Sequence, residues 1–368
     1  MAPDLLSGVL VYGATGYTGH LVAKKVKEVG LRATLAGRNE EKVKAIANEV
    51  QLPYEVFDLS DSAKLDNSVG RHAVVLHIAG PYTYTARPMV DACLRKKAHY
   101  IDVTGELRVV EAVQQRDEEA KASGVTLMPA IGYDASAGDC VAAHLKKRLP
   151  TATHLDLGLF VPRFAGSHRP RSLMFSRGTL KSFLVGILSS GGVVRRDGKL
   201  VDEALGARCR TFDLGEEGHA PFLSFAGSEL IAAHHSTGIP NITTYIHSAI
   251  SFPTNRVFTG LLRSSAFKSV AQFAIDKMLP RGPPEIDAEA IQLGAVGEAR
   301  DEKSGKIVRT FATCGSGYPF TAKMVVEVTR QILNGNFKPG FQTVTSAYGP
   351  EFLLSIPGAK FEDLPGSE

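Results

Sequence analysis

Short apolar runs alternate with segments of helical periodicity through the first third of the chain. The apolar, β-forming runs lie at 9–12, 33–36, 54–59, 73–79, 99–103 and 125–130. Between them, apolar positions recur at helical spacing, among other places over 40–50, 90–97 and 107–122. Near-continuous apolar strands separated by helices are typical of a parallel sheet covered on both faces. The pattern therefore predicts an α/β fold, with an N-terminal Rossmann domain built on a doubly wound parallel sheet over residues 1–135.

The pattern of apolar and polar positions changes after a helix that we expect over 136–149 and that Pro150 ends. Strand-like stretches then lie at 154–161, 243–251 and 307–314, separated by segments rich in Gly, Pro and Ser. Strands in this setting, with helices to cover one face, favour an antiparallel arrangement. We expect residues 136–318 to form a second α+β domain on a largely antiparallel sheet, and we expect it to hold the substrate.

The strand at 9–12 leads into a glycine-rich turn and then a helical pattern. The turn is Gly13-Ala14-Thr15-Gly16-Tyr17-Thr18-Gly19. In dinucleotide-binding folds such glycines allow a tight turn, leave room for a pyrophosphate and let helix and strand pack closely. The N–H groups and positive dipole end of the helix would then face the phosphates. The spacing G-x-x-G-x-x-G predicts a dinucleotide site, the alternative being a turn without a ligand.

Arg38 decides which dinucleotide we expect. It follows the second strand, at the position where an NAD-binding fold usually places an acidic residue for the ribose hydroxyls. A guanidinium there fits a 2′-phosphate, which favours NADP(H) over NAD(H) as cofactor. Asn39 lies beside it and can also cap the following helix. Asp58 ends the third strand, where it could accept from the adenine amino group or simply begin a turn.

Further polar residues follow later strands of the predicted sheet. Ala79-Gly80-Pro81-Tyr82 follows the fourth, and the glycine would let the backbone approach the nicotinamide. Tyr133 and Asp134 follow the sixth. Since the carboxyl ends of parallel strands share one sheet edge, we expect Tyr82, Tyr133 and Asp134 to form the catalytic site. Either tyrosine could donate a proton or line the pocket.

Composition limits the other classes of function. Lysines plus arginines exceed acidic residues by four, and the charges are mixed along the chain, so we expect no nucleic-acid partner. The four cysteines are far apart and have no histidine at metal spacing, so we expect no metal site and a reducing, cytoplasmic location. The apolar run 183–188 predicts a core helix, although 173–175 and 183–188 could instead contact lipid or a second copy in a homodimer.

Several stretches together resemble the saccharopine dehydrogenase-like oxidoreductases, and most of all the branch that includes trans-acting enoyl reductases of lipid biosynthesis. The stretches are 11–19, 36–38, 79–82 and 100–106 in the first half, and 176–179 with Ser182, 317–324, 338–340 and 347–349 in the second. The resemblance covers nearly the whole chain. One segment departs from the family pattern Gly-Phe-Asp-Ser-x-Pro-Ser-Asp, because here it runs Gly132-Tyr133-Asp134-Ala135-Ser136-Ala137-Gly138-Asp139.

This resemblance implies an NADP-binding Rossmann domain, a second α+β domain, and a C-terminal segment, 319–368, that folds back on the first. It implies that the glycine turn holds the pyrophosphate, that Arg38 holds the 2′-phosphate, and that Gly80, Pro81 and Tyr82 lie beside the nicotinamide. It also implies reduction of a polarised C=C bond in a small or carrier-bound hydrophobic substrate.

Two alternatives stay open from the sequence. One is C=N or C=O reduction, the chemistry of the family's namesake, for which Arg163, Arg169, Arg171 and Arg177 could bind substrate carboxylates. The other is an NADP-binding protein without turnover that acts as a scaffold on a lipid surface. Short-chain dehydrogenase chemistry is disfavoured, because no tyrosine has a lysine four residues later.

Overall fold

The computed structural model describes residues 8–160, 175–184, 191–248 and 293–367, together with 270, 273–275, 277 and 282. The chain divides into two compact units. The first unit comprises Met1–Thr104, Val109–Gly132 and Tyr318–Gln342, and the second comprises Gly105–Arg108, Tyr133–Gly317 and Thr343–Glu368. Of the residues named as alternative site or surface positions, Arg163, Arg169, Arg171, 173–174 and 185–188 lie outside the described part.

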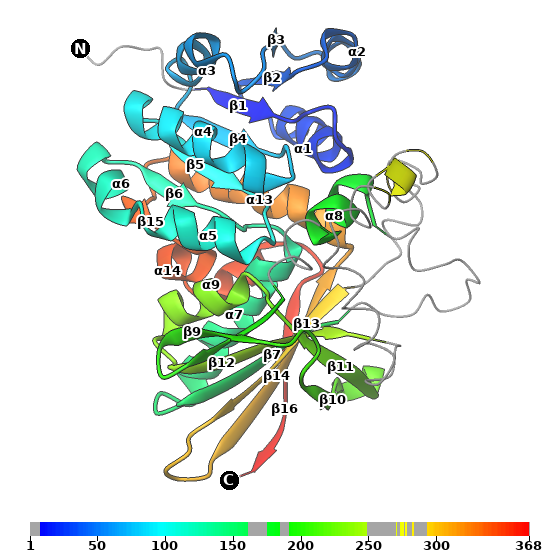
Figure 1. Ribbon diagram of the computed structural model, residues 1–368, viewed down its shortest axis with the longest axis vertical. Helices are drawn as coiled ribbons and strands as arrows, with labels where there is room; N and C mark the ends of the chain where they lie inside the picture. The colour runs from blue at the N-terminus through cyan, green and yellow to red at the C-terminus, as the bar shows by residue number, and fades with distance from the viewer. Residues whose placement is uncertain are drawn as a thin grey trace. The chain divides into compact units, whose positions relative to one another are not determined.

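The first unit is built on a seven-stranded sheet whose neighbouring strands are all parallel (Figure 1). Its strands are β1 (Val9–Tyr12), β2 (Ala33–Gly37), β3 (Tyr54–Val56), β4 (Val74–His77), β5 (His99–Asp102), β6 (Thr126–Met128) and β15 (Gly340–Phe341). They lie in the order β15-β6-β5-β4-β1-β2-β3. The chain crosses over between β1 and β4, so this pair marks the switch point at which doubly wound sheets bind ligands. The expected Rossmann sheet is confirmed.

The helices of the first unit connect these strands and cover the sheet. They are α1 (Tyr17–Glu28), α2 (Glu40–Val50), α3 (Ser62–Val69), α4 (Tyr82–Lys96), α5 (Leu107–Gln114), α6 (Asp117–Ser123) and α13 (Gly317–Leu333). All four residues of β1 and of β4 are buried. Burial on both faces explains why these strands are unbroken apolar runs in the sequence.

Helix boundaries differ from expectation at three places. Helix α4 begins at Tyr82, although it contains Pro88. The proline removes only the bond to the Tyr84 carbonyl, and Tyr84 is exposed, so water can satisfy that oxygen. The helix expected over 107–122 is divided into α5 and α6, and the helix expected from 136 begins at Tyr133.

The second unit is built on a nine-stranded mixed sheet. Its strands are β7 (His154–Phe160), β8 (Gly192–Arg196), β9 (Lys199–Glu203), β10 (Cys209–Asp213), β11 (His219–Phe225), β12 (Asn241–His247), β13 (Leu293–Arg300), β14 (Ile307–Gly315) and β16 (Lys360–Ser367). Among the described strands only β12 and β7 pair in parallel, while the other pairs are antiparallel. This confirms a largely antiparallel sheet.

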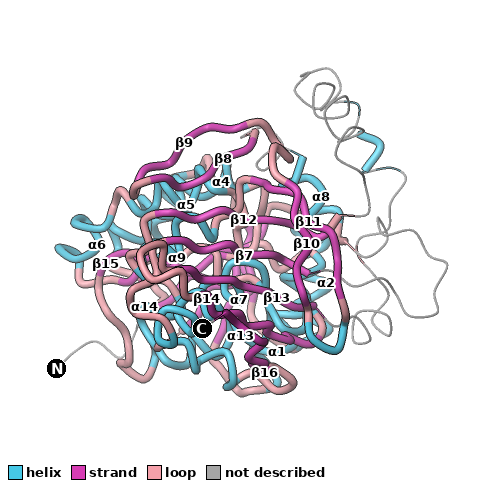
Figure 2. Tube along the Cα trace, turned by 90° about the horizontal axis from the view of Figure 1, so that it is seen from below, coloured by secondary structure: helices cyan, strands magenta, loops and turns pink. Residues whose placement is uncertain are grey.

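The sheet of the second unit is strongly curved, and Figure 2 shows β10 and β11 bent away from the line of β7 and β12. A Cβ placed on Gly215, just after β10, would lie 2.3 Å from Oε1 of Glu362 in β16, although β10 and β16 stand at opposite ends of the strand order. The concave side therefore encloses an apolar core: Phe160, Phe212, Leu214, Ala220, Phe222, Tyr245, Val296, Phe311 and Leu364.

Helices cover the opposite side of this sheet. They include α7 (Tyr133–Arg148) and α9 (Glu229–Thr237), with the shorter α8 (Arg177–Ser182), α14 (Val344–Tyr348), η3 (Gly215–Glu217) and η4 (Pro350–Ser355) elsewhere in the unit. A Cβ on Gly297 would meet Val141 at 2.5 Å and Leu145 at 2.6 Å, so α7 lies close against β13. No helix in the described ranges is both long and apolar enough to span a bilayer.

The C-terminal segment divides between the units. Residues 318–342 belong to the first unit, where β15 extends the parallel sheet, but residues 343–368 belong to the second. The expectation that all of 319–368 folds back on the first domain therefore stays a prediction, and the last part of this segment is assigned to the second unit. The reason is that β16 pairs with β14 along its length, which satisfies its backbone N–H and C=O groups there.

Candidate functional site

The glycine turn between β1 and α1 has three glycines with different steric demands. Gly13 has a positive φ of 94°, and a Cβ on it would lie 2.6 Å from the backbone of Ile78. A Cβ on Gly19 would lie 2.2 Å from the Gly13 oxygen, so this glycine lets α1 pack against the turn. At Gly16 the nearest atom would be 3.4 Å away, an ordinary contact. The chain itself therefore requires glycine at 13 and 19, whereas Gly16 leaves space for a ligand.

Gly16 is also the N-cap of α1 and has no side chain with which to cap it. The first turn of the helix contains no acidic residue, while Lys25 and Lys27 lie in its last turn. The positive end of the helix dipole at Gly16 is thus left uncompensated by side chains of the helix itself. Space and positive potential coincide at Gly16, which is the arrangement that binds phosphate groups.

Arg38 follows β2 with its side chain 76% exposed, and its Nε lies 3.9 Å from Oδ2 of Asp58. At this exposure such a contact stabilises the fold little, so the guanidinium can turn to a ligand. Asn39 caps α2, because its Oδ1 accepts from the Lys42 N–H at 2.9 Å. Asp58 accepts from the Ser60 N–H and hydroxyl, and these bonds hold its pKa below the usual range. Asn39 and Asp58 therefore each have a local structural role.

The segment after β4 brings Tyr82 back against that strand. The Tyr82 side chain is buried, its hydroxyl donates to the His77 carbonyl at 3.4 Å, and its ring packs edge-on against the His77 ring. The Thr85 hydroxyl donates to the Ala79 carbonyl at 2.7 Å. Tyr82 thus fixes the start of α4, a role for which the sequence alone offered no sign.

A buried polar network that the sequence analysis missed joins β4, β5 and β6. The Tyr100 hydroxyl donates to Oδ2 of Asp102 at 2.6 Å and must therefore accept from Nδ1–H of His77, 3.1 Å away. Oδ1 of Asp102 accepts from the N–H groups of Thr104 and Ala130. Burial lowers the pKa of His77 to about 3, so this histidine is neutral at physiological pH. The sequence feature that could have indicated this network is the histidine inside the apolar run 73–79.

In the second unit, Tyr133 is held by two backbone carbonyls. Its hydroxyl lies within hydrogen-bond distance of the Phe160 oxygen, at 3.1 Å, and of the Gly294 oxygen. Burial and nearby acidic groups raise its pKa well above the usual value. A phenol has one proton, and here carbonyls accept it, so Tyr133 connects α7 to β7 and β13.

Asp134 lies beside a second carboxyl group, that of Glu229, which the sequence analysis did not single out. Glu229 is 2% exposed, and its Oε1 has no hydrogen-bond partner among the described residues. Two glycines make room for it: a Cβ on Gly138 would lie 2.8 Å from its Cγ, and one on Gly227 would lie 2.1 Å from its Oε2. The fold therefore reserves this space for Glu229.

Burial raises the pKa values of Asp134 and Glu229, and repulsion from Asp134 adds to the rise for Glu229. Two neighbouring carboxyl groups with so little solvation cannot both ionise at neutral pH, so the pair retains a proton. Asp134 is half-buried, at the start of α7, while Glu229 lies deeper at the start of α9. The Asp134–Glu229 pair is thus a carboxylic acid available at a pH where ordinary carboxyl groups are ionised.

Other acidic residues near by serve the fold. Asp139 is buried and accepts from the Ser236 hydroxyl and from the N–H and hydroxyl of Thr345, which joins α7, α9 and α14. Tyr133 and Asp134 belong to a different unit from Tyr82, so their convergence on one catalytic site stays a prediction. Within the described ranges, no group of three or more His, Cys, Asp or Glu side chains could hold a metal ion.

Comparison with known families identifies the first unit. Residues 9–128 match the family model described as the saccharopine dehydrogenase NADP binding domain. This part of the chain is therefore similar to the NADP-binding domain of that family. The predicted family resemblance and the predicted cofactor, NADP(H), are therefore confirmed for the part of the chain that contains the glycine turn and Arg38.

Curated relatives match part of the chain. A trans-acting enoyl reductase from Mycobacterium leprae is 34% identical over 158 residues, which cover 40% of this chain and 38% of that protein. A lipid droplet localized protein from Caenorhabditis elegans is 28% identical over 210 residues, which cover 51% of this chain and 48% of that protein. The chain thus spans less than half the length of these relatives.

The fold beyond the NADP-binding domain is also known from a solved structure. Saccharopine dehydrogenase (L-Glu forming) from Saccharomyces cerevisiae matches 98% of this chain and 100% of its own, with a TM-score of 0.65. At 16% sequence identity this likeness shows the two-domain fold alone.

The geometry of the NADP-binding domain fits its cofactor. The space at Gly16 lies at the uncapped start of α1, where a pyrophosphate can accept from backbone N–H groups. Arg38 is exposed after β2, at the usual distance in sequence for a residue that contacts the ribose. Both features suit a 2′-phosphorylated dinucleotide.

Proposed function

We propose that this protein is an NADPH-dependent reductase that acts on a polarised C=C bond in a hydrophobic substrate, either a small molecule or a carrier-bound intermediate. The observation that carries the proposal is the open position at Gly16 before the uncapped helix α1, inside an NADP-binding domain with Arg38 at the ribose position. The similarity to a trans-acting enoyl reductase favours a C=C bond as the acceptor.

The residues that we propose to hold the cofactor belong to three segments of the first unit. Those of the glycine turn would bind the pyrophosphate, those after β2 and β3 the adenosine end, and those after β4 the nicotinamide end. They are Gly13, Ala14, Thr15, Gly16, Tyr17, Thr18 and Gly19, then Arg38, Asn39 and Asp58, then Ala79, Gly80, Pro81 and Tyr82. When bound, NADPH supplies a hydride.

Reduction of a C=C bond consumes a hydride and a proton, so the protein needs a proton source for the second carbon. Three residues are candidates: Tyr82, Tyr133 and Asp134. The Tyr133 hydroxyl donates to backbone carbonyls, and the Tyr82 hydroxyl donates to the His77 carbonyl. Asp134 remains, and Glu229 beside it keeps the pair protonated at neutral pH. We propose the Asp134–Glu229 pair, which retains one proton at neutral pH, as the proton donor, with the less buried Asp134 as the group that delivers the proton.

The test is NADPH oxidation with three acceptors, an α,β-unsaturated thioester, a cyclic imine and a ketone, with products identified by mass spectrometry. We expect turnover with the thioester and a product heavier by two hydrogens. The Asp134→Asn variant, which cannot give up a proton as an acid, should lose about 100-fold or more in kcat, within the usual range for removal of a general acid.

The Glu302→Gln variant is the matched control, because Glu302 is exposed and belongs to the same unit. It should keep the kcat of the parent. Turnover confined to the imine or the ketone would contradict the choice of a C=C acceptor. Unchanged kcat in Asp134→Asn would remove Asp134 from the reaction, while leaving the cofactor assignment intact.

A second candidate is C=N or C=O reduction, which the fold shared with saccharopine dehydrogenase favours. Imine turnover in the same assay would establish it.

A third candidate is a non-catalytic NADP-binding scaffold on a lipid surface, which the likeness to a lipid droplet localized protein favours. Flotation with liposomes, combined with NADPH binding but no turnover, would support the scaffold. Sedimentation would test a homodimer, and cell fractionation would distinguish a cytoplasmic from a membrane-associated location.

A further inference from the structure

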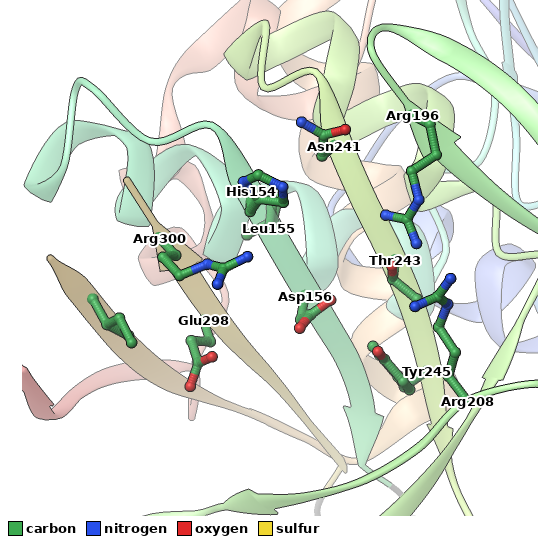
Figure 3. Close-up of a pocket in the computed structure, with 11 residues that line it drawn as sticks. His154, Leu155, Asp156, Arg196, Arg208, Asn241, Thr243, Tyr245, Glu298 and Arg300 are labelled. Atoms are coloured by element: carbon green, nitrogen blue, oxygen red, sulfur yellow. The ribbon is translucent and has the colours of Figure 1, made fainter. Parts of the chain in front are cut away.

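The second unit contains a polar cavity of about 300 Å³ on its sheet, where β7, β12 and β13 lie side by side (Figure 3). Arg300 of β13 lies on one side, next to His154. Arg196 and Arg208 lie on the other, with their guanidinium groups directed toward Thr243. The cavity is thus lined by cationic groups from two sides.

The acidic residues of the cavity already have cationic partners. Asp156 pairs with Arg210, and Glu298 pairs with Arg210 at 3.2 Å and with Arg309 at 2.6 Å. Neither Arg210 nor Arg309 lines the cavity. The direct ionic contacts of the two carboxylates are thus made with Arg210 and Arg309, although Asp156 also interacts electrostatically with Arg300.

The lining arginines are compensated only in part. Glu203 accepts from Arg208 at 2.9 and 2.5 Å, while Arg196 reaches the same carboxylate only at 3.8 Å. The Arg300 side chain is exposed and forms no hydrogen bond or ion pair with the described residues, although its charge acts on the Asp156 carboxylate. Three arginines and two carboxylates line the cavity, and Arg196 and Arg300 are the arginines without a close ionic partner in the described part of the chain.

We propose that this cavity binds the phosphate group of a phosphorylated small molecule or lipid. Arginine is the side chain best suited to phosphate, since its fork of N–H groups pairs with two oxygens at once. A phosphate has oxygens on several sides. A single phosphate group can therefore contact Arg300 on one side of the cavity and Arg196 on the other. The hydroxyl of Thr243 lies beside the guanidinium groups of Arg196 and Arg208 and offers a further hydrogen bond.

The experiment uses the full chain saturated with NADP⁺, so that the phosphate positions of the cofactor site are filled. Inorganic phosphate is then titrated by calorimetry at constant ionic strength. We expect saturable binding that Arg300→Gln weakens about tenfold or more, the effect of losing a charge-assisted hydrogen bond. Arg196→Gln should weaken it comparably. Lys303→Gln removes a positive charge three residues from Arg300, outside the cavity, and should change the affinity less than about twofold.

Two further probes define the ligand. Arg300-dependent sedimentation with phosphatidic acid vesicles would identify a lipid headgroup, and phosphate binding without vesicle binding would identify a soluble phosphorylated molecule. Malonate, a dianion with carboxylates, should bind more weakly than phosphate. The proposal is overturned if the parent binds phosphate no better than chloride, if Arg300→Gln and Arg196→Gln both keep the parent affinity, or if malonate binds more tightly.

Discussion

The glycine turn of the first unit and the Asp134–Glu229 pair of the second handle charge in opposite ways. At the turn, backbone N–H groups and a helix dipole produce positive potential without any charged side chain. At the pair, two acidic side chains lie in a space that offers little solvation, and Oε1 of Glu229 has no partner among the described residues. The turn is suited to attract an anion, whereas the pair is suited to keep a proton.

This difference decides what a substitution does at each place. The turn depends on glycines, which have no side chain. Adding a side chain should therefore abolish ligand binding, and it should leave the fold intact at positions where the new Cβ meets no close neighbour. The pair depends on two specific carboxyl groups. Removing one should therefore change the pH at which the other ionises.

The largest effect is expected for Gly16→Val. The valine side chain would occupy the space before α1, and we expect NADPH affinity to fall by at least about 100-fold, or about 2.7 kcal/mol. The backbone at Gly16, with φ −75° and ψ 168°, suits any residue, so the unliganded protein should lose no more than about 1 kcal/mol of stability. Calorimetric titration with NADPH and urea unfolding measure the two quantities.

Gly19→Val provides the contrast, because a Cβ there collides with the Gly13 oxygen. This variant should lose stability as well as affinity. If Gly16→Val still binds NADPH normally, the pyrophosphate does not lie at this turn.

The second effect concerns Arg38. Replacement by Asp removes a charge-assisted hydrogen bond to the 2′-phosphate, worth about 1.5 to 3 kcal/mol, and adds repulsion. NADPH affinity should fall about tenfold or more, while NADH affinity should change little, because NADH lacks the 2′-phosphate. Arg95→Gln, at an exposed arginine of α4, is the matched control and should leave both affinities unchanged. Equal losses for both nucleotides would show that Arg38 does not distinguish them.

Glu229→Gln should change the pH dependence of stability. The pKa values of Asp134 and Glu229 are raised in the folded state, so above about pH 4 the folded chain binds more protons than the unfolded chain. Stability therefore falls as pH rises through the raised pKa values. Removing one of the two groups should make this fall shallower, by about 1 kcal/mol or more between about pH 5 and pH 9.

Urea unfolding at several pH values measures this difference. Glu302→Gln should show the slope of the parent, because that side chain is exposed. A Glu229→Gln slope identical to that of the parent would mean that the buried pair does not retain a proton.

The turn and the pair also differ in how far the sequence predicts them. The glycine turn was predictable because all its determinants lie within seven consecutive residues and follow from backbone sterics. The pair was only half predictable: Asp134 follows a recognisable strand, but Glu229 is 95 residues away along the chain and follows no motif. Only the packing of α9 against α7 at Gly138 brings the two carboxyl groups together.

The two sheets show the same contrast. The central strands β1 and β4 of the parallel sheet are buried and mostly apolar, so their existence could be predicted from short windows, whereas the two-residue strand β15 was not predicted. The curved sheet contains strands such as β9 and β10, whose residues are mostly exposed or half-buried and show no apolar run. Their place depends on pairing with β8 and β11. For the same reason the pairing of β16 with β14 was not foreseen from the sequence.

The smallest effect is expected for Tyr133→Phe, which removes one hydroxyl from the residue next to Asp134. The hydroxyl donates to the carbonyls of Phe160 and Gly294, so its loss should cost about 0.5 to 1.5 kcal/mol of stability, measured by urea unfolding. If Tyr133 only connects α7 to the sheet, kcat should fall far less than in Asp134→Asn. A kcat loss equal to that of Asp134→Asn would instead indicate that the Tyr133 phenol donates the proton. The general acid of the second unit would then be Tyr133 and not the Asp134–Glu229 pair.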